Sequence, residues 1–142
     1  MPPAIKDKTR KRSTAHVLVT HARKVMAGLG KGHTERVYHT AMLSSLNKAG
    51  LAYRSEVLAP IYFMGDVVGF GRCDVLVDNL VVEFKANKQS PKQASSQLMK
   101  YIESVLQTKK GPIQGLVINF NQKTGRIDTH RPSVKRKRPR KN

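Results

Sequence analysis

The sequence predicts a single α/β domain, because helix-like and strand-like segments alternate along the chain. Two β-branched, apolar runs in the middle of the chain are joined by Asp78-Asn79, a dipeptide suited to a tight two-residue hairpin. Segments with helix start and stop residues lie before these runs and after them. The length of 142 residues is enough for one domain with a modest core.

Three helices are predicted. The first covers about residues 14–27 and ends at a run of glycines. The second covers about residues 33–49, followed by Gly50 as its C-cap. The third begins at Ser90-Pro91, with Ser as the N-cap and Pro in the first turn, and reaches about residue 108. The side chains of the second helix expected to face the core are Val37, Ala41, Leu43 and Leu46.

Five strands are predicted from runs rich in β-branched and aromatic residues. The first four cover about residues 55–63, 67–77, 80–86 and 113–120, and a short last strand follows a polar hairpin at 121–126. Gly69 and Gly71 lie inside the second run, which predicts a bend or a bulge there.

The hairpin at Asp78-Asn79 predicts a pair of opposed carboxylates. Counting outward from this turn places Asp74 opposite Glu83, with Cβ atoms about 4.5–5.5 Å apart. Strand side chains alternate between faces, so Lys85 joins Glu83 on the same face. The opposite face is apolar and predicts a core made of Val75, Val77, Leu80, Val82 and Phe84.

Two carboxylates this close repel each other, so one is protonated or a cation lies between them. Mg²⁺ prefers one or two carboxylates, completed by waters and phosphate oxygens. A lysine beside the metal can help to deprotonate a water or stabilise charge on a phosphate. Asp74, Glu83 and Lys85 therefore form a minimal phosphodiester-cleaving site. The alternative is a surface hairpin with ordinary polar side chains, and the spacing alone does not decide between them.

The segment Leu29-Gly30-Lys31-Gly32-His33-Thr34-Glu35-Arg36-Val37-Tyr38 resembles the motif of the GxxExxY proteins, which are small members of the PD-(D/E)XK nuclease superfamily. Gly32, Glu35 and Tyr38 fill the three named positions, while Lys31 stands where a Pro is commoner. The order and spacing of the shorter motifs extend the likeness over about residues 14–128. These motifs are Ile61-Tyr62-Phe63-Met64-Gly65, Arg72-Cys73-Asp74, Val82-Glu83-Phe84-Lys85-Ala86, Gln97-Leu98-Met99-Lys100-Tyr101 and Gly115-Leu116-Val117-Ile118-Asn119-Phe120.

The resemblance implies a restriction-endonuclease-like core, a central mixed β-sheet flanked by helices in the order αβββαβ. It implies that Asp74 and Glu83 bind Mg²⁺, with Mn²⁺ as a substitute, and that Lys85 is catalytic. It also implies that Glu35, on the second helix, completes the metal site. His39 lies four residues after Glu35, and we expect no more from it than a hydrogen bond to that carboxylate.

The resemblance also implies that Gln97, on the third helix, supports the catalytic site. Gln93, Gln97 and Tyr101 recur every four residues and so form one stripe on that helix. Tyr38 and Tyr101 are expected in supporting roles, and ordinary packing and capping are the alternative for Gln97 and Tyr101. Arg72, next to the predicted metal site, is expected to contact nucleic acid.

Net charge is +18, from 27 Lys and Arg against 9 Asp and Glu, and it is uneven. We expect residues 1–13 and 131–142 to be disordered basic arms around a folded domain at 14–130. Such arms bind phosphates without sequence preference and lack an apolar face for a membrane, so nucleic acid is the expected partner, DNA ahead of RNA. The nucleic-acid contacts predicted in the C-terminal arm are Lys135, Arg136, Lys137, Arg138, Arg140 and Lys141.

The expected compartment is intracellular. Cys73 is the single cysteine, it is expected on the apolar side of the hairpin, and no intrachain disulfide can form. The basic C-terminal run fits a nuclear localisation signal as well as a phosphate-binding tail, and association with a virion fits the same charge. A mitochondrial presequence is disfavoured by Pro2-Pro3 and by the lack of an amphipathic pattern.

The function predicted from the sequence is Mg²⁺-dependent hydrolysis of phosphodiester bonds in nucleic acid. The alternative belongs to a different class of protein, a non-catalytic nucleic-acid-binding subunit of a nucleoprotein assembly such as a ribosome or a virion. A homodimer is compatible with the cutting of two strands, but no pattern in the sequence predicts one.

Overall fold

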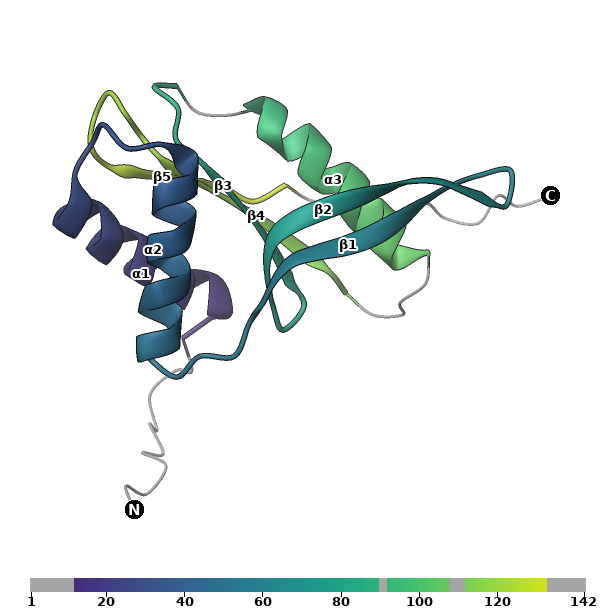
Figure 1. The fold of residues 1–142 in the computed structure, drawn as a ribbon, viewed down its shortest axis with the longest axis horizontal. Helices are drawn as coiled ribbons and strands as arrows, with labels where there is room; N and C mark the ends of the chain where they lie inside the picture. The colour runs from purple at the N-terminus through teal and green to yellow at the C-terminus, as the bar shows by residue number, and fades with distance from the viewer. Residues whose placement is uncertain (1–11, 90–91, 108–111, 133–142) are drawn as a thin grey trace, which may run out of the picture.

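The computed structural model describes residues 12–89, 92–107 and 112–132. Its elements follow the predicted order and come close to the predicted bounds (Figure 1). The predicted start of the third helix at Ser90-Pro91 and its end near residue 108 lie outside the described residues. Among the described helices, none combines the length and the apolar character needed to cross a membrane. The elements are α1 (Thr14–Leu29), α2 (Glu35–Lys48), β1 (Arg54–Phe63), β2 (Asp66–Val77), β3 (Leu80–Lys85), α3 (Lys92–Leu106), β4 (Gln114–Phe120) and β5 (Ile127–His130).

The strands form one mixed five-stranded sheet in the order β1-β2-β3-β4-β5. Among the described strands, β3 and β4 run parallel and the other neighbours pair antiparallel. Parallel neighbours need a crossover connection, which α3 supplies here. The sheet flanked by helices confirms the predicted restriction-endonuclease-like arrangement.

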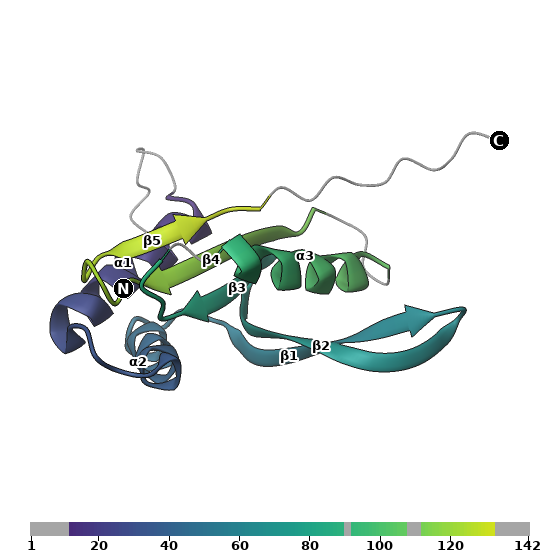
Figure 2. The same ribbon diagram turned by 90° about the horizontal axis from the view of Figure 1, so that it is seen from above.

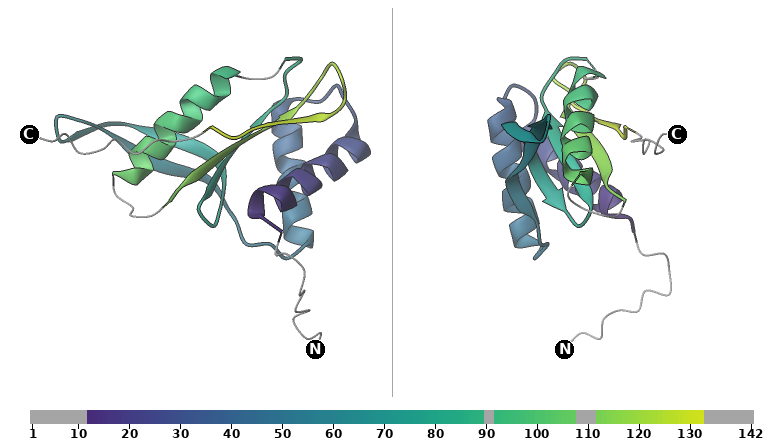
Figure 3. Two further views of the ribbon diagram at one scale, coloured as in Figure 1. Left: turned by 180° about the vertical axis from the view of Figure 1, so that it is seen from behind. Right: turned by 90° about the vertical axis from the view of Figure 1, so that its right-hand side faces the viewer.

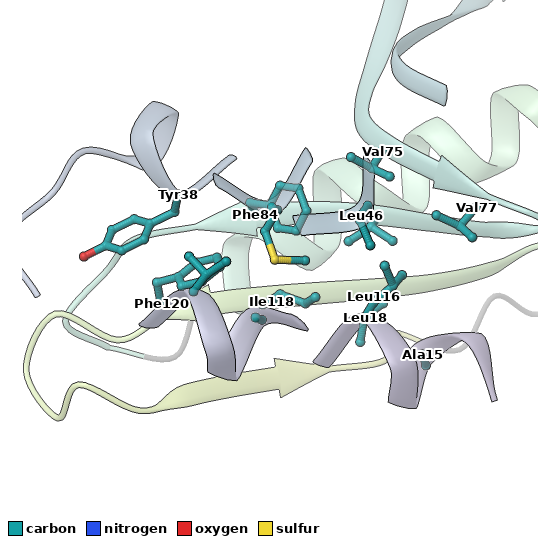
Figure 4. Packing of buried hydrophobic residues seen from close by; sticks show 14 of the residues in the cluster. Ala15, Leu18, Tyr38, Leu46, Val75, Val77, Phe84, Leu116, Ile118 and Phe120 are labelled. Atoms are coloured by element: carbon teal, nitrogen blue, oxygen red, sulfur yellow. The ribbon is translucent and has the colours of Figure 1, made fainter. Parts of the chain in front are cut away.

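Two hydrophobic cores lie on opposite faces of the sheet, one under α1 and α2 and the other under α3 (Figures 1 and 3). The first contains the complete apolar face predicted for the β2–β3 hairpin, packed on Leu18, Met42 and Leu46 of the helices (Figure 4). In the same core the Tyr38 ring stacks on Phe120, with ring centroids 4.6 Å apart. The second core joins α3 to the sheet through Ala59, Cys73, Val81, Ala94, Leu98, Tyr101, Ile102 and Val117.

Two predicted burial assignments are wrong. Val37 is 39 % exposed, because the buried stripe of α2 runs through Tyr38, Met42 and Leu46 at a spacing of four residues. Cys73 is fully buried, but it lies in the second core against α3 and not with Val75. Residues two apart on a regular strand share a face, so β2 twists sharply between these two residues.

The β1–β2 hairpin is longer than the other strand pairs and projects from the body of the domain, past the end of α3 (Figures 1 and 2). Its register shifts between Ile61 and Tyr62, opposite Gly69, which confirms the bulge predicted from the glycines. Met64 and Gly65 form the turn, both with positive φ.

Gly115, at the start of β4, gives a test of the packing between α3 and the sheet. A Cβ on this residue would lie 2.9 Å from Ile102 Cδ1 and 3.0 Å from Leu98 Cδ2. Both are packed core side chains, so we expect Gly115→Ala to lower the free energy of unfolding by about 1–3 kcal/mol. Denaturant titration of the purified protein measures the change.

Gly28→Ala is the matched control for this substitution. Gly28 lies in α1, and a Cβ added there would have no neighbouring atom within 4 Å. Alanine has the higher helix propensity, so the control should gain up to about 1 kcal/mol. Equal effects of the two substitutions would contradict the tight packing of α3 on β4.

Candidate active site

Asp74 and Glu83 meet where the regular pairing of β2 and β3 ends. The ladder runs from Val77↔Leu80 to Val75↔Val82, which confirms the predicted register. Beyond Val75 and Val82, the two strands are joined by hydrogen bonds from backbone N–H groups to side-chain carboxylates instead of to backbone carbonyls. The Asp74 N–H donates to Glu83 Oε1 at 3.2 Å, and the Phe84 N–H donates to Asp74 Oδ2 at 2.7 Å. Each carboxylate is thus fixed by the backbone of the opposite strand.

The electrostatics of this pair differ from those of exposed carboxylates. Burial, and next the charge of Asp74, raise the pKa of Glu83 from 4.5 to about 8. A hydrogen bond between the two side chains, which needs a shared proton, acts in the same direction, while the charge of Lys85 lowers the pKa in part. At neutral pH and without a cation, the pair therefore keeps one proton.

Lys85 and Glu35 approach the carboxylates from two elements. Lys85 ends β3 and is half-buried, on the same side of the strand as Glu83. Glu35 begins α2, where burial raises its pKa, the charge of Lys85 lowers it and the charge of Asp74 raises it. The acidic and basic groups that the sequence selected thus lie within electrostatic range of one another.

His39 is a site neighbour whose position differs from the expected one. Its Nδ1 lies 4.0 Å from Asp74 Oδ1, and its ring packs on Phe84 with centroids 5.3 Å apart. Its Nε2 is buried and has no hydrogen-bond partner among the described residues. The i, i+4 spacing from Glu35 pointed to this part of α2, but only the packing of α2 on β3 brings the imidazole to Asp74.

Asn119 is a buried positioning residue that the sequence did not single out. It pairs with Lys85 across β3 and β4. Its Oδ1 accepts the Asn87 N–H at 2.8 Å, and its Nδ2 donates to the Asn87 carbonyl at 3.3 Å and to Asp128 Oδ2 at 3.2 Å. This network holds the chain directly after Lys85, and a polar residue inside the apolar run of β4 was its only trace in the sequence.

Gln97 and Arg72 line a groove between α3 and the β1–β2 hairpin, and neither Asp74 nor Glu83 is part of its lining. The groove has a volume of about 470 Å³ and is also lined by Tyr101 and Lys100. Gln97 and Arg72 are exposed, whereas Tyr101 is buried and hydrogen-bonded to Cys73. Tyr101 therefore supports the junction of α3 with the hairpin, and Gln97 and Arg72 face the solvent next to it.

Tyr38 is buried in the first core, and its contacts there are structural. Its hydroxyl donates to the Gly30 carbonyl at 2.7 Å and accepts from Gln122 Nε2 at 3.0 Å. It joins the loop before α2 to the turn after β4. The remaining predicted nucleic-acid contacts, residues 135–141, lie outside the described residues.

Two of the predicted ligands, Asp74 and Glu83, are placed so that they could bind a hard divalent cation. Asp74 and Glu83 offer paired carboxylate oxygens whose mutual repulsion a cation would relieve. Within the described ranges, no group of three or more His, Cys, Asp or Glu side chains is close enough to hold a metal. The assignment of Glu35 as a third ligand therefore stays a prediction, with a water-mediated contact as its alternative form.

Residues 12–132 match the PD-(D/E)XK nuclease superfamily, and the chain belongs to this superfamily. The match is at the superfamily level, so the finer GxxExxY assignment stays a prediction. A crystal structure from Eubacterium rectale, described as a putative exonuclease, is similar at 11 % identity with a TM-score of 0.47. The similarity covers 88 % of this chain and 61 % of that one. No curated protein matches the sequence.

The raised pKa of Glu83 predicts how stability depends on pH. In metal-free protein, folding favours the protonated carboxyl, so the free energy of unfolding should fall as pH rises from about 4.5 to about 8. Glu83→Gln keeps a neutral side chain of similar shape and should remove this decline. One pKa unit corresponds to about 1.4 kcal/mol, so the variant should be more stable than wild type by a few kcal/mol above pH 8.

Denaturant titration in a chelator, at several pH values, measures the difference between variant and wild type. Glu103→Gln is the control, because Glu103 is exposed on α3. This control should follow the wild-type curve at every pH. Parallel curves for Glu83→Gln and wild type would contradict the buried, proton-sharing pair.

Proposed function

We propose that the protein hydrolyses phosphodiester bonds of nucleic acid in a Mg²⁺-dependent reaction at Asp74, Glu83 and Lys85. The observation that carries the proposal is the crossed pair of hydrogen bonds in which a backbone N–H of each strand donates to the carboxylate of the other strand. Without a cation, such a pair of carboxylates destabilises the folded protein. Destabilising groups of this kind are typical of functional sites. Membership of the nuclease superfamily supports the same reaction class.

The roles of the residues follow from their chemistry. Asp74 and Glu83 would hold the cation by their carboxylate oxygens, and Glu35 would join them directly or through a water. The bound Mg²⁺, or Mn²⁺ in its place, would polarise the phosphate and favour ionisation of the attacking water. Lys85 orients that water and stabilises negative charge that develops on the phosphate oxygens. Gln97 and Arg72, exposed in the adjacent groove, would contact the substrate backbone.

The charge of the chain supports nucleic acid as the substrate. Of the net +18, the residues before 13 contribute +4 and those after 130 contribute +7. Basic segments of this kind release counterions from phosphates and give affinity without sequence preference. DNA is the favoured substrate and RNA the alternative; no feature of the sequence separates the two, so the assay must include both.

Three variants test the catalytic assignment. Asp74→Asn and Glu83→Gln should abolish Mg²⁺-dependent cleavage while folding is retained, because each removes a charged metal ligand. Lys85→Met should lower turnover by about a hundredfold to ten-thousandfold with little change in substrate binding. Cleavage of duplex, single-stranded and branched DNA and RNA, followed at saturating substrate, measures the effect.

Asp66→Asn is the control and should cleave like wild type, because Asp66 is exposed at the start of β2 and does not line the groove between α3 and the hairpin. Full activity of Asp74→Asn or Glu83→Gln would contradict the assignment of these residues as metal ligands. A Lys85→Met variant that binds substrate weakly but turns over normally at saturation would reduce Lys85 to a phosphate contact.

The basic ends also support the alternative function, a non-catalytic subunit of a nucleoprotein assembly. Residues 133–142 carry six basic residues and no acidic ones. Deleting them should weaken binding to all sequences alike and flatten the salt dependence, by up to about 0.9 of log–log slope for each duplex phosphate that the shortened chain no longer neutralises. The shortened enzyme should still cleave at high substrate concentration.

The matched control for the deletion keeps the length of the segment but replaces its Lys and Arg by Gln, and it should behave like the deletion. Under the alternative function, the deletion would block incorporation into the assembly while Asp74→Asn would leave it intact. An unchanged salt slope would show that the segment does not bind phosphate and would leave a localisation signal as its role.

A further inference from the structure

One stretch of this highly basic chain is almost free of charge. Residues 57–71, which form the distal part of the β1–β2 hairpin and its turn, contain one charged side chain, Asp66. The other fourteen residues are apolar or aromatic side chains, Pro60 and glycines. We call this stretch the apolar arm.

The apolar arm is exposed. Among the described residues, ten large hydrophobic side chains are exposed, and eight of them belong to this arm. Phe63 at the turn is 65 % exposed, Met64 86 % and Phe70 63 %. Isolated exposed apolar residues are normal on a soluble domain, but a continuous group is typical of an interaction site. The eight residues are Leu58, Ile61, Tyr62, Phe63, Met64, Val67, Val68 and Phe70.

The two faces of the arm differ. Ala59 pairs with Gly71, and this face lies against Tyr101 of α3, where a Cβ on Gly71 would be 3.3 Å from the Tyr101 ring. Pro60 pairs with Phe70 and Leu58 pairs with Arg72, so these residues belong to the opposite face, which is apolar apart from Arg72 at the end nearest the body of the domain. In the views of Figures 1 and 2 no other described element covers that face of the projecting hairpin.

The composition of the arm does not suit a phosphate backbone. Proteins bind phosphates mainly through Lys and Arg, and residues 57–71 contain neither, although the chain has 27 of them. The centre of a protein interface is instead depleted of charge and enriched in aromatic residues and Met. The arm has this second composition, with Tyr62, Phe63, Met64 and Phe70 exposed together.

The size and shape of the arm favour a second copy of this chain as the partner. Ile61 and Tyr62 line the groove beside α3, and the other six exposed side chains of the arm present on the order of 700 Å² at about 200 Å² per large side chain. A standard interface takes about 800 Å² from each partner. A two-stranded ribbon is marginal in water unless another layer covers it. Two arms related by a twofold axis would each supply that layer for the other.

The edge of β1 decides how the two arms pack. β1 is the outer strand of the sheet, but Pro60 lies in its middle and removes an N–H from any ladder with a further strand. Strand addition along this edge is therefore disfavoured. Packing of the Leu58–Phe70 face against its counterpart uses side chains alone and is compatible with Pro60. Each copy carries a net charge of +18, so two copies repel each other. Residues 57–71 contribute none of the positive charge, which makes this stretch the least repelled.

We propose that two copies of this chain form a symmetric homodimer through the apolar faces of their β1–β2 hairpins, with Phe70 near the twofold axis, Leu58 inside the interface and Arg72 at its rim. The dimer does not require catalytic activity, so a test of the dimer and a test of the nuclease function can give different outcomes. It predicts a distinctive salt response. Association through apolar side chains between like-charged molecules strengthens with added salt, whereas association through bound nucleic acid weakens.

Sedimentation velocity of the full chain, freed of nucleic acid, tests the dimer over a range of concentrations and up to about 1 M salt, where the Debye length is about 3 Å. We expect a concentration-dependent dimer that tightens as salt rises. Phe70→Lys and Leu58→Lys should each raise the dissociation constant by at least about tenfold, because each places a desolvated charge in the interface. Val37→Lys, at an exposed apolar residue of α2, should leave it unchanged.

A mixing experiment makes the test independent of the folding of a single variant. Phe70→Lys and Phe70→Glu should each be monomeric with the wild-type circular dichroism spectrum, and an equal mixture of the two should recover the dimer. A wild-type chain that stays monomeric at about 100 μM would overturn the proposal. So would an equal loss of association in Val37→Lys, or loss of DNA affinity without loss of association in Phe70→Lys, which would assign the arm to nucleic acid.

Discussion

The rest of the domain is arranged around two crossed hydrogen bonds, from the Asp74 N–H to the Glu83 carboxylate and from the Phe84 N–H to the Asp74 carboxylate. At this point β2 stops pairing with β3 and twists, so that Val75 and Cys73 pack on opposite faces of the sheet. The ladder bonds that the twist removes are replaced by side-chain oxygens. A polar pair thus completes the backbone hydrogen bonding of two strands, and the same groups are left available to a cation.

Support for this polar pair comes from both cores. Val75, Val82 and Phe84 anchor the hairpin against α1 and α2, while Cys73 fixes the departing end of β2 against Tyr101. Asn119 fixes the backbone beyond Lys85 through the Asn87 loop. The acidic and basic side chains of the strands therefore project from backbone that both cores hold in place, which is the condition for preorganised electrostatics. The same rigid packing keeps Glu83 buried next to Asp74 and so raises its pKa.

Features that depend on residues close together in the sequence could be predicted, and features that depend on contacts between distant segments could not. The β2–β3 register was predictable because a two-residue turn and strict alternation fix it locally. The parallel register of β3 and β4, the approach of His39 to Asp74 and the Asn119 network depend on contacts between distant segments, which periodicity does not encode. Val37 was misplaced because several apolar residues of α2 compete for the core, and Tyr38 takes the position. Cys73 was misplaced because alternation was carried through a twist.

The parallel pairing of β3 with β4 has a consequence for how the chain acquires its structure during synthesis. The β2–β3 hairpin is local and can pair early, whereas its second neighbour β4 is separated from β3 by all of α3. The first helix likewise packs against a core that includes Ile118 and Phe120, so its docking waits for the last third of the chain. Until β4 emerges from the ribosome, β3 is an open strand edge with apolar side chains on both faces. Ordering of Lys85 by Asn119 comes at the end of this sequence, which delays a competent site until nearly the entire domain has been made.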